Sequence, residues 1–370
     1  MTSPRTGLPA LAIVGSRTTA RRNARGTGLS VFSLDPGGAW EQVSGYEITN
    51  PTFLAVDHAR SIVHAVHGDG SDVSTYSVEP ETGALALIGA QSTGGRNPAH
   101  LALTPLCDHL VVVNHSSGSI VSLPVEAAGT LGPVRSCLEF SGVPGPHRSD
   151  QTGSKPHQVV FDPAGRYLLV PDKGLDRIFV CRIDGDGLLC VHSSAATREG
   201  AGPRHLAFHP TLPIVYTVDE LSSTITIFDW DAEKGALSRR QILPTTDPFD
   251  VDDTRAAEIA VHPTGRFVYA SNRRGAGDHT PGGPGPDSVA VFRVEPDTGS
   301  LTALGRHSTD GIRPRHFTFD ESGTTLYVAN ERSDSITAFT VDADTGAMTA
   351  AGTVAKTGSP VCITLLPAHD

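Results

Sequence analysis

The chain has 370 residues and a formal net charge of −11, with 29 Lys and Arg against 40 Asp and Glu. This acidic balance argues against a nucleic-acid or acidic-membrane partner. No stretch approaches the ~20 apolar residues that cross a bilayer, and the N-terminus lacks the apolar segment of a signal peptide. The five cysteines form no C-x-x-C pair, which is typical of free thiols in a reducing compartment. We therefore expect a cytoplasmic protein.

In chain order, the first predicted elements are two apolar runs of strand length, residues 11–14 and 29–34. Seven copies of one pattern follow: a proline, two variable residues, an apolar run, a turn with Pro or Gly, a second apolar run and a polar stop. Successive copies lie 47, 58, 47, 53, 58 and 46 residues apart, and such a period indicates a repeat architecture. The copies are anchored at Pro51, Pro98, Pro156, Pro203, Ala256 (where the proline is lost), Pro314 and Pro360.

Within each copy, short β-branched and aromatic runs alternate with turn residues. In the sixth copy, residues 316–319, 325–329 and 335–341 read as strands, and the copy closes with the turn Asp344-Thr345-Gly346. No segment shows a sustained apolar period of 3.6, so we expect almost no helix. Radial blades of four antiparallel strands, which leave only short edges, suit this content. The sequence predicts an all-β, seven-bladed propeller.

The two ends of the chain predict how the ring closes. Only one strand's worth of residues follows Pro360, whereas the N-terminal runs lack an inner strand. We expect both ends to share one blade, because an open ring would expose two blade faces to water. The whole chain, residues 1–370, is then one propeller domain.

Candidate site residues converge where the blades meet the central channel. In an antiparallel hairpin the first strand begins and the second strand ends at the same rim, so these positions of all blades gather at one mouth. His157, Glu220 and Arg273 differ there from the residue types of the sister copies, which favours a function over packing. The alternative for Glu220 is a surface ion pair with Arg273 or Arg204.

Three further rim residues have a strong structural interpretation. His100, His205 and His316 share one repeat position, and a recurring residue usually serves the blade, for example by bonding a backbone carbonyl of the next blade. Arg204 recurs as Arg315, which lowers the weight of either residue alone.

Other site types find little support in the sequence. There is no H-E-x-x-H, zinc-type Cys/His cluster, Walker or Rossmann glycine loop, or G-x-S-x-G. We therefore expect no metal and no cofactor. The Gly- and Pro-rich segment 274–287 reads as a long loop, either a lid over the channel mouth or a flexible insertion.

A family resemblance is densest in five segments, which are Lys155-Pro156-His157-Gln158, residues 171–178, residues 202–210, Asp219-Glu220-Leu221 and Ser271-Asn272-Arg273. Together they resemble the seven-bladed propeller lactonase family, which contains bacterial 6-phosphogluconolactonases and carboxy-muconate cyclases. The family's proposed active site carries over to His157, Arg204, Glu220 and Arg273. Two neighbours depart from the family pattern and bear on substrate preference: Lys155 stands where relatives commonly show His, and Asp219 replaces the usual Asn.

The resemblance implies a lactonase that hydrolyses 6-phosphogluconolactone, a small anionic substrate of the pentose phosphate pathway, at the channel mouth. His157 or Glu220 would act as general base and orienter. Arg204 and Arg273 would polarise the carbonyl or clamp an anionic group. The further substrate contacts expected are Lys173, His100, His205 and Arg315.

Two other functions remain open at this point. A carboxy-cis,cis-muconate cyclase would use the same cation-rich rim to bind carboxylates, and a non-enzymatic propeller would use it to bind a protein or another metabolite. The oligomeric state is also open.

Overall fold

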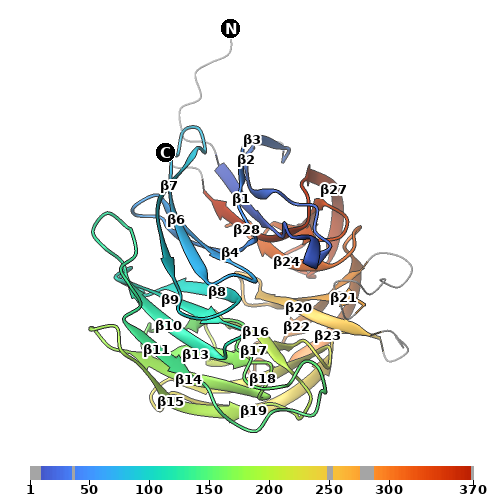
Figure 1. Cartoon of the computed structure of the whole chain (residues 1–370). Helices are drawn as coiled ribbons and strands as arrows, with labels where there is room; N and C mark the ends of the chain where they lie inside the picture. Colours follow the sequence, from blue (N-terminus) through green and yellow to red (C-terminus); the bar gives the residue numbers. More distant parts are fainter. Residues whose placement is uncertain (1–9, 36–37, 248–252, 276–286, 368–370) are drawn as a thin grey trace.

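The computed structural model describes residues 10–35, 38–247, 253–275 and 287–367. In these residues, seven four-stranded antiparallel sheets stand as blades around a ring (Figure 1). Besides strands, the described chain contains the short 3-10 helix η1 (Ala20–Arg22). In these ranges no helix is long and apolar enough to span a membrane. The prediction of a seven-bladed propeller with almost no helix is confirmed.

We number the blades along the chain by their innermost strands, and in each the strands are given from the channel outward. Blades 1 to 3 consist of β4 (Pro51–Asp57), β5 (Ile62–His67), β6 (Asp72–Val78) and β7 (Leu85–Ser92); β8 (Pro98–Leu103), β9 (His109–Asn114), β10 (Ser119–Pro124) and β11 (Ser136–Glu139); and β12 (Val160–Phe161), β13 (Leu168–Asp172), β14 (Arg177–Ile183) and β15 (Leu189–Ala196). Blades 4 to 6 consist of β16 (Pro203–Phe208), β17 (Ile214–Asp219), β18 (Thr224–Asp231) and β19 (Ala236–Pro244); β20 (Thr254–Val261), β21 (Phe267–Arg274), β22 (Ser288–Val294) and β23 (Leu301–Ser308); and β24 (Pro314–Phe319), β25 (Thr325–Asn330), β26 (Ser335–Val341) and β27 (Met348–Lys356).

Blade 7 closes the ring with strands from both ends of the chain. Its innermost strand is β28 (Pro360–Leu366), which pairs antiparallel with β1 (Ala10–Ser16). Next come β2 (Gly28–Leu34) and β3 (Trp40–Glu47). The predicted closure is therefore confirmed, and Figure 1 shows β28 lying beside β1.

The sequence anchors lie at the innermost strands. Five of these strands begin at a proline, a position where the missing N–H costs no ladder bond, and Ala256 lies inside β20. Blade 3 differs from the expected pattern, because Pro156 forms only an isolated bridge with Asp172 and regular pairing begins at Val160. Here the Asp172 carboxylate accepts the Lys155 N–H at 2.8 Å, so a side chain replaces part of the ladder.

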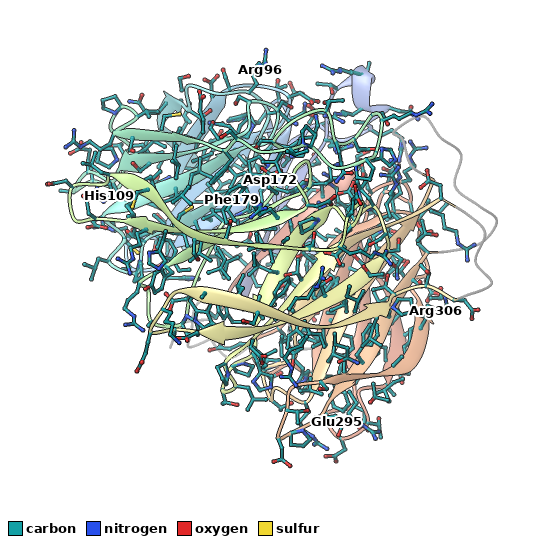
Figure 2. All side chains as sticks on the ribbon, turned by 90° about the horizontal axis from the view of Figure 1, so that it is seen from below. Arg96, His109, Asp172, Phe179, Glu295 and Arg306 are labelled. Atoms are coloured by element: carbon teal, nitrogen blue, oxygen red, sulfur yellow. The ribbon has the colours of Figure 1, made fainter. Side chains whose placement is uncertain are left out.

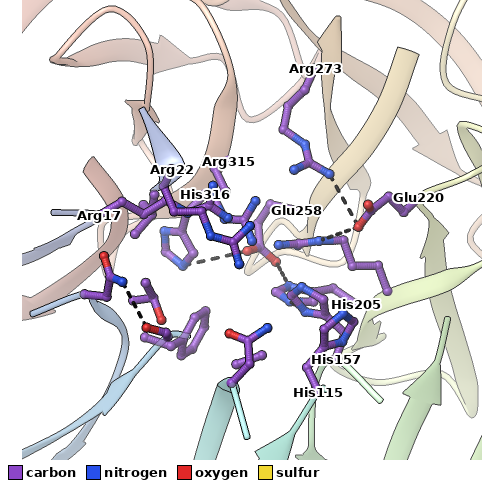
Figure 3. A pocket seen from close by; sticks show the side chains of 18 of the residues that line it. Arg17, Arg22, His115, His157, His205, Glu220, Glu258, Arg273, Arg315 and His316 are labelled. Atoms are coloured by element: carbon purple, nitrogen blue, oxygen red, sulfur yellow. Dashed lines mark hydrogen bonds and ion pairs between the residues drawn. The ribbon is translucent and has the colours of Figure 1, made fainter. Parts of the chain in front are cut away.

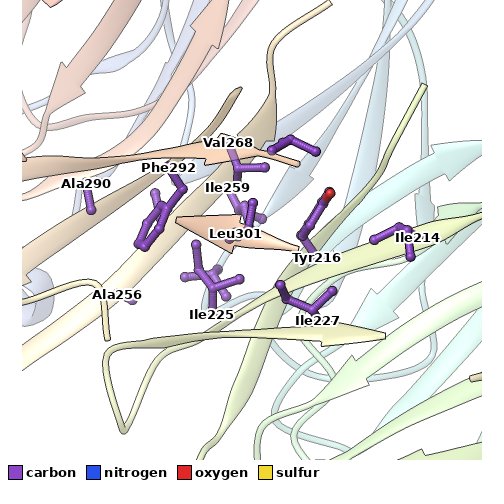
Figure 4. Close-up of a cluster of buried hydrophobic side chains, with 13 residues drawn as sticks. Ile214, Tyr216, Ile225, Ile227, Ala256, Ile259, Val268, Ala290, Phe292 and Leu301 are labelled. Carbon is purple, nitrogen blue, oxygen red and sulfur yellow. The ribbon is translucent and has the colours of Figure 1, made fainter. Parts of the chain in front are cut away.

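Apolar side chains fill the spaces between neighbouring blades. The cluster in Figure 4 joins blades 4 and 5, with Ile227 of one blade and Phe292 of the other both buried. In Figure 2 the buried Phe179 lies inside the molecule, whereas the exposed Glu295 and Arg306 lie toward its outer edge. The blades therefore hold one another by apolar burial, the main stabilising term in folding.

The Thr-Gly turns of blades 5 and 6 each contact the preceding blade. Tyr216 Oη of blade 4 donates to the carbonyl of Gly299 in blade 5, and Tyr269 Oη of blade 5 donates to that of Gly346 in blade 6, both at 2.9 Å. Gly299 has a φ of +68°, and a Cβ there would lie 2.7 Å from Ile214 Cγ1. Only glycine combines this backbone conformation with so close an approach.

Candidate active site

A cavity of about 200 Å³ opens at the rim where the innermost strands begin, and side chains from all seven blades reach it (Figure 3). Of the described residues that line it, seven are Arg or Lys, four are His and four are Asp or Glu. The chain as a whole carries a net charge of −11. The cavity is therefore a locally cationic site in an acidic protein.

The innermost strands aim side chains into this cavity because most of them are bulged close to their anchor. In blade 1 the ladder shifts register between Pro51 and Phe53, and equivalent shifts occur in blades 2, 4, 5, 6 and 7. A β-bulge re-aims the side chain of the residue that leaves the pairing pattern. Arg204 in blade 4, Glu258 in blade 5 and Arg315 in blade 6 occupy such positions and line the cavity.

Seven of the eight residues expected from the sequence line the cavity: His157, Lys173, Arg204, His205, Glu220, Arg273 and Arg315. His100 does not line it. Its ring packs beneath, with ring centroids 4.1 Å from Phe53 and 5.7 Å from His205. Its Nδ1 accepts the Val159 N–H of the next blade at 3.5 Å, so His100 joins blades, through an N–H rather than through a carbonyl.

Glu220 lies at the centre of an ion-pair cluster. Its Oε1 is 3.2 Å from Lys173 Nζ, and its Oε2 is 3.2 Å from Arg204 Nε and 3.5 Å from Arg273 Nη2. Burial alone would raise the pKa of this carboxyl, but the Lys173, Arg273 and Arg204 charges together lower it well below its ordinary value. Glu220 is thus a carboxylate at neutral pH that holds three cations in place.

The arginines are desolvated as well as crowded. Arg204 donates from Nη1 to the Ala257 carbonyl at 2.5 Å, and Arg273 from Nη2 to the Ala256 carbonyl at 3.0 Å. Burial lowers the pKa of Arg204 to about 10. Burial and the neighbouring arginines also lower the pKa of Arg315 well below its ordinary value. Among the described residues Arg315 has no hydrogen-bond or ion-pair partner, so its guanidinium is available to an anion.

His157 lies against a second imidazole at the cavity wall. Its Nδ1 is 3.1 Å from His205 Nε2, and His205 Nδ1 is 2.8 Å from Glu258 Oε1. Burial, followed by the Arg204 and His205 charges, lowers the pKa of His157 well below its ordinary value. The His157 imidazole is therefore neutral at pH 7 and can accept a proton.

Several lining residues escaped the sequence analysis because they lie outside the repeat. Arg17 and Arg22 come from the segment between β1 and β2, where Arg17 Nη1 pairs with Glu331 Oε1 at 3.0 Å and Arg22 forms a close ion pair with Asp69. The basic run 17–25 was the available signal, but nothing local shows that it folds over the mouth.

Asp150 is a second such case. It lies in the connection between β11 and β12, 3.3 Å from Lys173 Nζ and 3.2 Å from Arg255 Nη1. The only hint in the sequence was the 58-residue spacing to the third anchor.

Within the described ranges, no group of three or more His, Cys, Asp or Glu side chains is arranged to hold a metal ion. Most of the segment 274–287 lies outside the described residues.

Comparison with known proteins identifies the chain. A family model described as a seven-bladed β-propeller lactonase matches residues 11–365. The chain belongs to this family. It is 30% identical over 324 residues to a 6-phosphogluconolactonase of Bacillus subtilis, which covers 86% of this chain and 88% of the relative. A 6-phosphogluconolactonase of Pectobacterium carotovorum is 32% identical over 265 residues, 70% of this chain and 71% of the relative.

Solved structures agree with this assignment to the lactonase family. A putative 6-phosphogluconolactonase from Bacteroides fragilis superimposes with a TM-score of 0.86 at 28% identity, over 99% of this chain and all of that one. A periplasmic gluconolactonase from Pseudomonas aeruginosa gives a TM-score of 0.87 at 26% identity, over 97% and 99% of the two chains. The resemblance noted in the sequence is therefore confirmed, and the enzyme class is that of a lactonase.

Proposed function

We propose that this lactonase hydrolyses the lactone of an anionic sugar acid, with 6-phosphogluconolactone as substrate and 6-phosphogluconate as product. One observation carries the proposal: a neutral imidazole, His157, faces a wall of desolvated cations inside a single cavity. The names of the bacterial relatives support the substrate. A cytoplasmic location remains a prediction from the sequence.

The charges and ion pairs of the cavity residues indicate which of them acts as the base. Glu220 is a poor base, because both its oxygens are held by cations. His157 is the better base, because it is neutral and carries no ion pair. It would take a proton from a water that attacks the lactone carbonyl. Arg204 and Arg273 would stabilise the oxyanion that develops there, a task for preorganised donors.

The anionic group of the substrate needs a cation that has no other partner. Arg315 meets this condition among the described residues, since it lines the cavity and pairs with no carboxylate there. A guanidinium bonds two phosphate oxygens at once. We assign Arg315 to the phosphate, and Glu220 to holding Lys173, Arg204 and Arg273 in place.

The test is a pair of matched substrates measured by the acid they release in a pH-stat. We expect the purified protein to hydrolyse 6-phosphogluconolactone with a kcat/KM at least tenfold above that for gluconolactone. Arg315→Ala should remove most of this preference, because a hydrogen bond to a charged group contributes roughly 1.5–3 kcal/mol, about ten- to a hundredfold.

Two results would redirect the proposal. Equal rates on both lactones would remove the phosphate from the substrate. Turnover of carboxy-cis,cis-muconate without lactone hydrolysis would favour the cyclase, and activity on neither substrate class would favour a binding protein.

A further inference from the structure

A buried chain of three side chains runs inward from the cavity wall. Glu258 Oε1 lies 2.8 Å from His205 Nδ1, and His205 Nε2 lies 3.1 Å from His157 Nδ1. All three residues are buried, with relative exposures of 6%, 1% and 6% for Glu258, His205 and His157. They come from blades 5, 4 and 3, so the chain crosses two blade boundaries.

The contacts of Glu258 identify it as the proton acceptor of the chain. Its Oε1 also accepts the Ile259 N–H at 3.2 Å. Its Oε2 lies 3.8 Å from His316 Nε2, and that nitrogen carries the proton because His316 Nδ1 accepts the Ile363 N–H at 3.3 Å. Every described group around this carboxyl thus presents a donor. Burial raises the pKa of this carboxyl. The donors around it favour the carboxylate form, which can only accept hydrogen bonds.

The order of protons along the chain then follows. His205 donates from Nδ1 to Glu258, so its Nε2 carries the lone pair in the neutral ring. That nitrogen accepts the Nδ1–H of His157. The remaining nitrogen of His157, Nε2, is left without a proton.

His205 differs in its hydrogen bonds from the residues at the same repeat position in other blades. The residues at that position in blades 2, 3 and 6, His100, Gln158 and His316, each accept a backbone N–H of the next blade. For blade 4 the equivalent N–H is that of Ile259 in blade 5, and Glu258 of the same strand takes it. His205 is thereby released from joining blades and bonds two side chains instead.

We propose that Glu258 and His205 are positioning residues that fix the tautomer of His157 and present its Nε2 as the base of the lactonase reaction. The inference rests on the proposed function and specifies how its base is set. His157 Nε2 takes a proton from water while the water oxygen bonds to the lactone carbonyl carbon. When the ring C–O bond breaks, its electron pair stays on the ring oxygen, which receives that proton from Nε2. One water is consumed and one hydroxy acid is formed.

The charged groups around His157 disfavour its protonated form, so a base at this position needs a carboxylate that stabilises it. Three cations, Arg204, Arg273 and Arg315, and three histidines, His100, His115 and His316, face the chain from neighbouring blades. The Arg204 and Arg315 charges disfavour a positive charge on His157, and the Arg273 charge disfavours one on His205. The one other carboxylate facing it, Glu220, is held by its own cations. Glu258 is the acid that can stabilise the imidazolium through His205.

The first test compares Glu258→Gln and His205→Gln with wild type on 6-phosphogluconolactone. We expect kcat to fall about ten- to a hundredfold with KM within about threefold, because substrate contacts remain. In Glu258→Gln the acid limb of the kcat/KM profile should move to lower pH, since loss of the negative charge disfavours protonated His157. Unchanged kcat and an unmoved limb in both variants would overturn the proposal, as would a rise in KM alone.

Two matched controls separate positioning from stability. Asp162→Asn and His209→Gln alter a buried carboxylate and a buried histidine at the opposite rim, whose partners are mainly backbone groups. They should lower Tm without moving kcat or the pH limb. If they reproduce the effects of Glu258→Gln and His205→Gln, the proposed role is wrong.

A second measurement needs neither a variant nor activity. The ¹⁵N shifts of the histidine rings in the wild-type protein at pH 7 should show His157 protonated at Nδ1 and not at Nε2. The opposite tautomer would overturn the inference even if the protein is an active lactonase. The expected tautomer without lactone hydrolysis would instead leave the chain standing and remove the proposed function.

Discussion

The two rims of the propeller are built from the same strands but differ in the partners of their buried polar side chains. At the rim away from the cavity, side chains bond backbone: Asp162 accepts the Tyr167 N–H at 2.8 Å and Asp320 accepts the Thr325 N–H at 3.0 Å. At the cavity rim, side chains from different blades bond one another, as between His205 and Glu258. Polar groups that satisfy local backbone serve the fold. Buried polar groups that meet across blades around the cavity are available for chemistry.

The largest expected difference is between alanine variants of one histidine at the cavity rim and one at the other rim. His157→Ala should lower kcat on 6-phosphogluconolactone about 10²–10⁴-fold, because general acid–base catalysis contributes that much. His209→Ala, at the other rim, should lower Tm and leave kcat unchanged, because His209 bonds backbone groups of its own turn and of Gly265. Wild-type turnover in His157→Ala with an intact circular dichroism spectrum would contradict this assignment.

A smaller contrast is expected between two arginines. Arg273→Ala should lower kcat/KM about ten- to a hundredfold, since a charged hydrogen bond is worth roughly 1.5–3 kcal/mol. Arg266→Ala removes an exposed ion pair with Asp344 at the other rim and should leave kcat/KM unchanged. Steady-state kinetics of both variants decide the point. Equal losses would show that charge at either rim matters alike.

Adjacent acids at the cavity rim should respond to pH with opposite signs. Burial raises the pKa of Asp219 to about 7, so its contribution to stability is present at low pH and is lost as the pH rises toward 7. The pKa of Glu220 is depressed, so its contribution is present at neutral pH and is lost as the pH falls below about 4.5.

Tm measured from pH 3.5 to 8 tests both signs. Asp219→Asn should flatten the decline in Tm between about pH 4 and 7, and Glu220→Gln should flatten the drop below about pH 4.5. Tm curves that run parallel to the wild-type curve would refute both assignments.

The smallest effect is expected from a turn at the far rim. Asp320→Ala removes a bond to the Thr325 N–H in an exposed turn, which should cost about 1 kcal/mol of unfolding free energy. Urea denaturation measures this loss, while kcat should stay at the wild-type value. A fall in kcat would contradict the view that polar groups at the far rim contribute to stability and not to catalysis.

The fold could be predicted because each blade repeats the same short sequence pattern. The prolines that begin β4, β8, β16, β24 and β28 recur at a blade's spacing, and the Thr-Gly turns recur with them. The site could be predicted only where it used those same positions. Arg204 and Arg315 could be named because each directly follows an anchor, at the rim position that the repeat defines, and in the structure a bulge at each position turns the side chain into the cavity.

The remaining part of the site depends on contacts that no local pattern encodes. Arg17 reaches Glu331 across 314 residues, and Asp150 reaches Arg255 across 105. His100 and His205 occupy one repeat position, yet only His205 reaches the cavity. The two histidines also differ in their partners: His100 bonds a backbone N–H of the next blade, whereas Glu258 takes the N–H that His205 would otherwise have bonded.

Because β28 pairs with β1, blade 7 can form only after β28 has been synthesised. A ribosome adds about 5–20 residues per second, so β1 waits roughly 20–70 seconds for the strand that completes its blade. During that interval the edges of blade 7 are unpaired, and such edges invite association with other chains. Val361 of β28 and Arg17 beside β1 both line the cavity. The nascent protein therefore gains its complete site only when β28 pairs with β1, and lactonase activity reports on a closed ring.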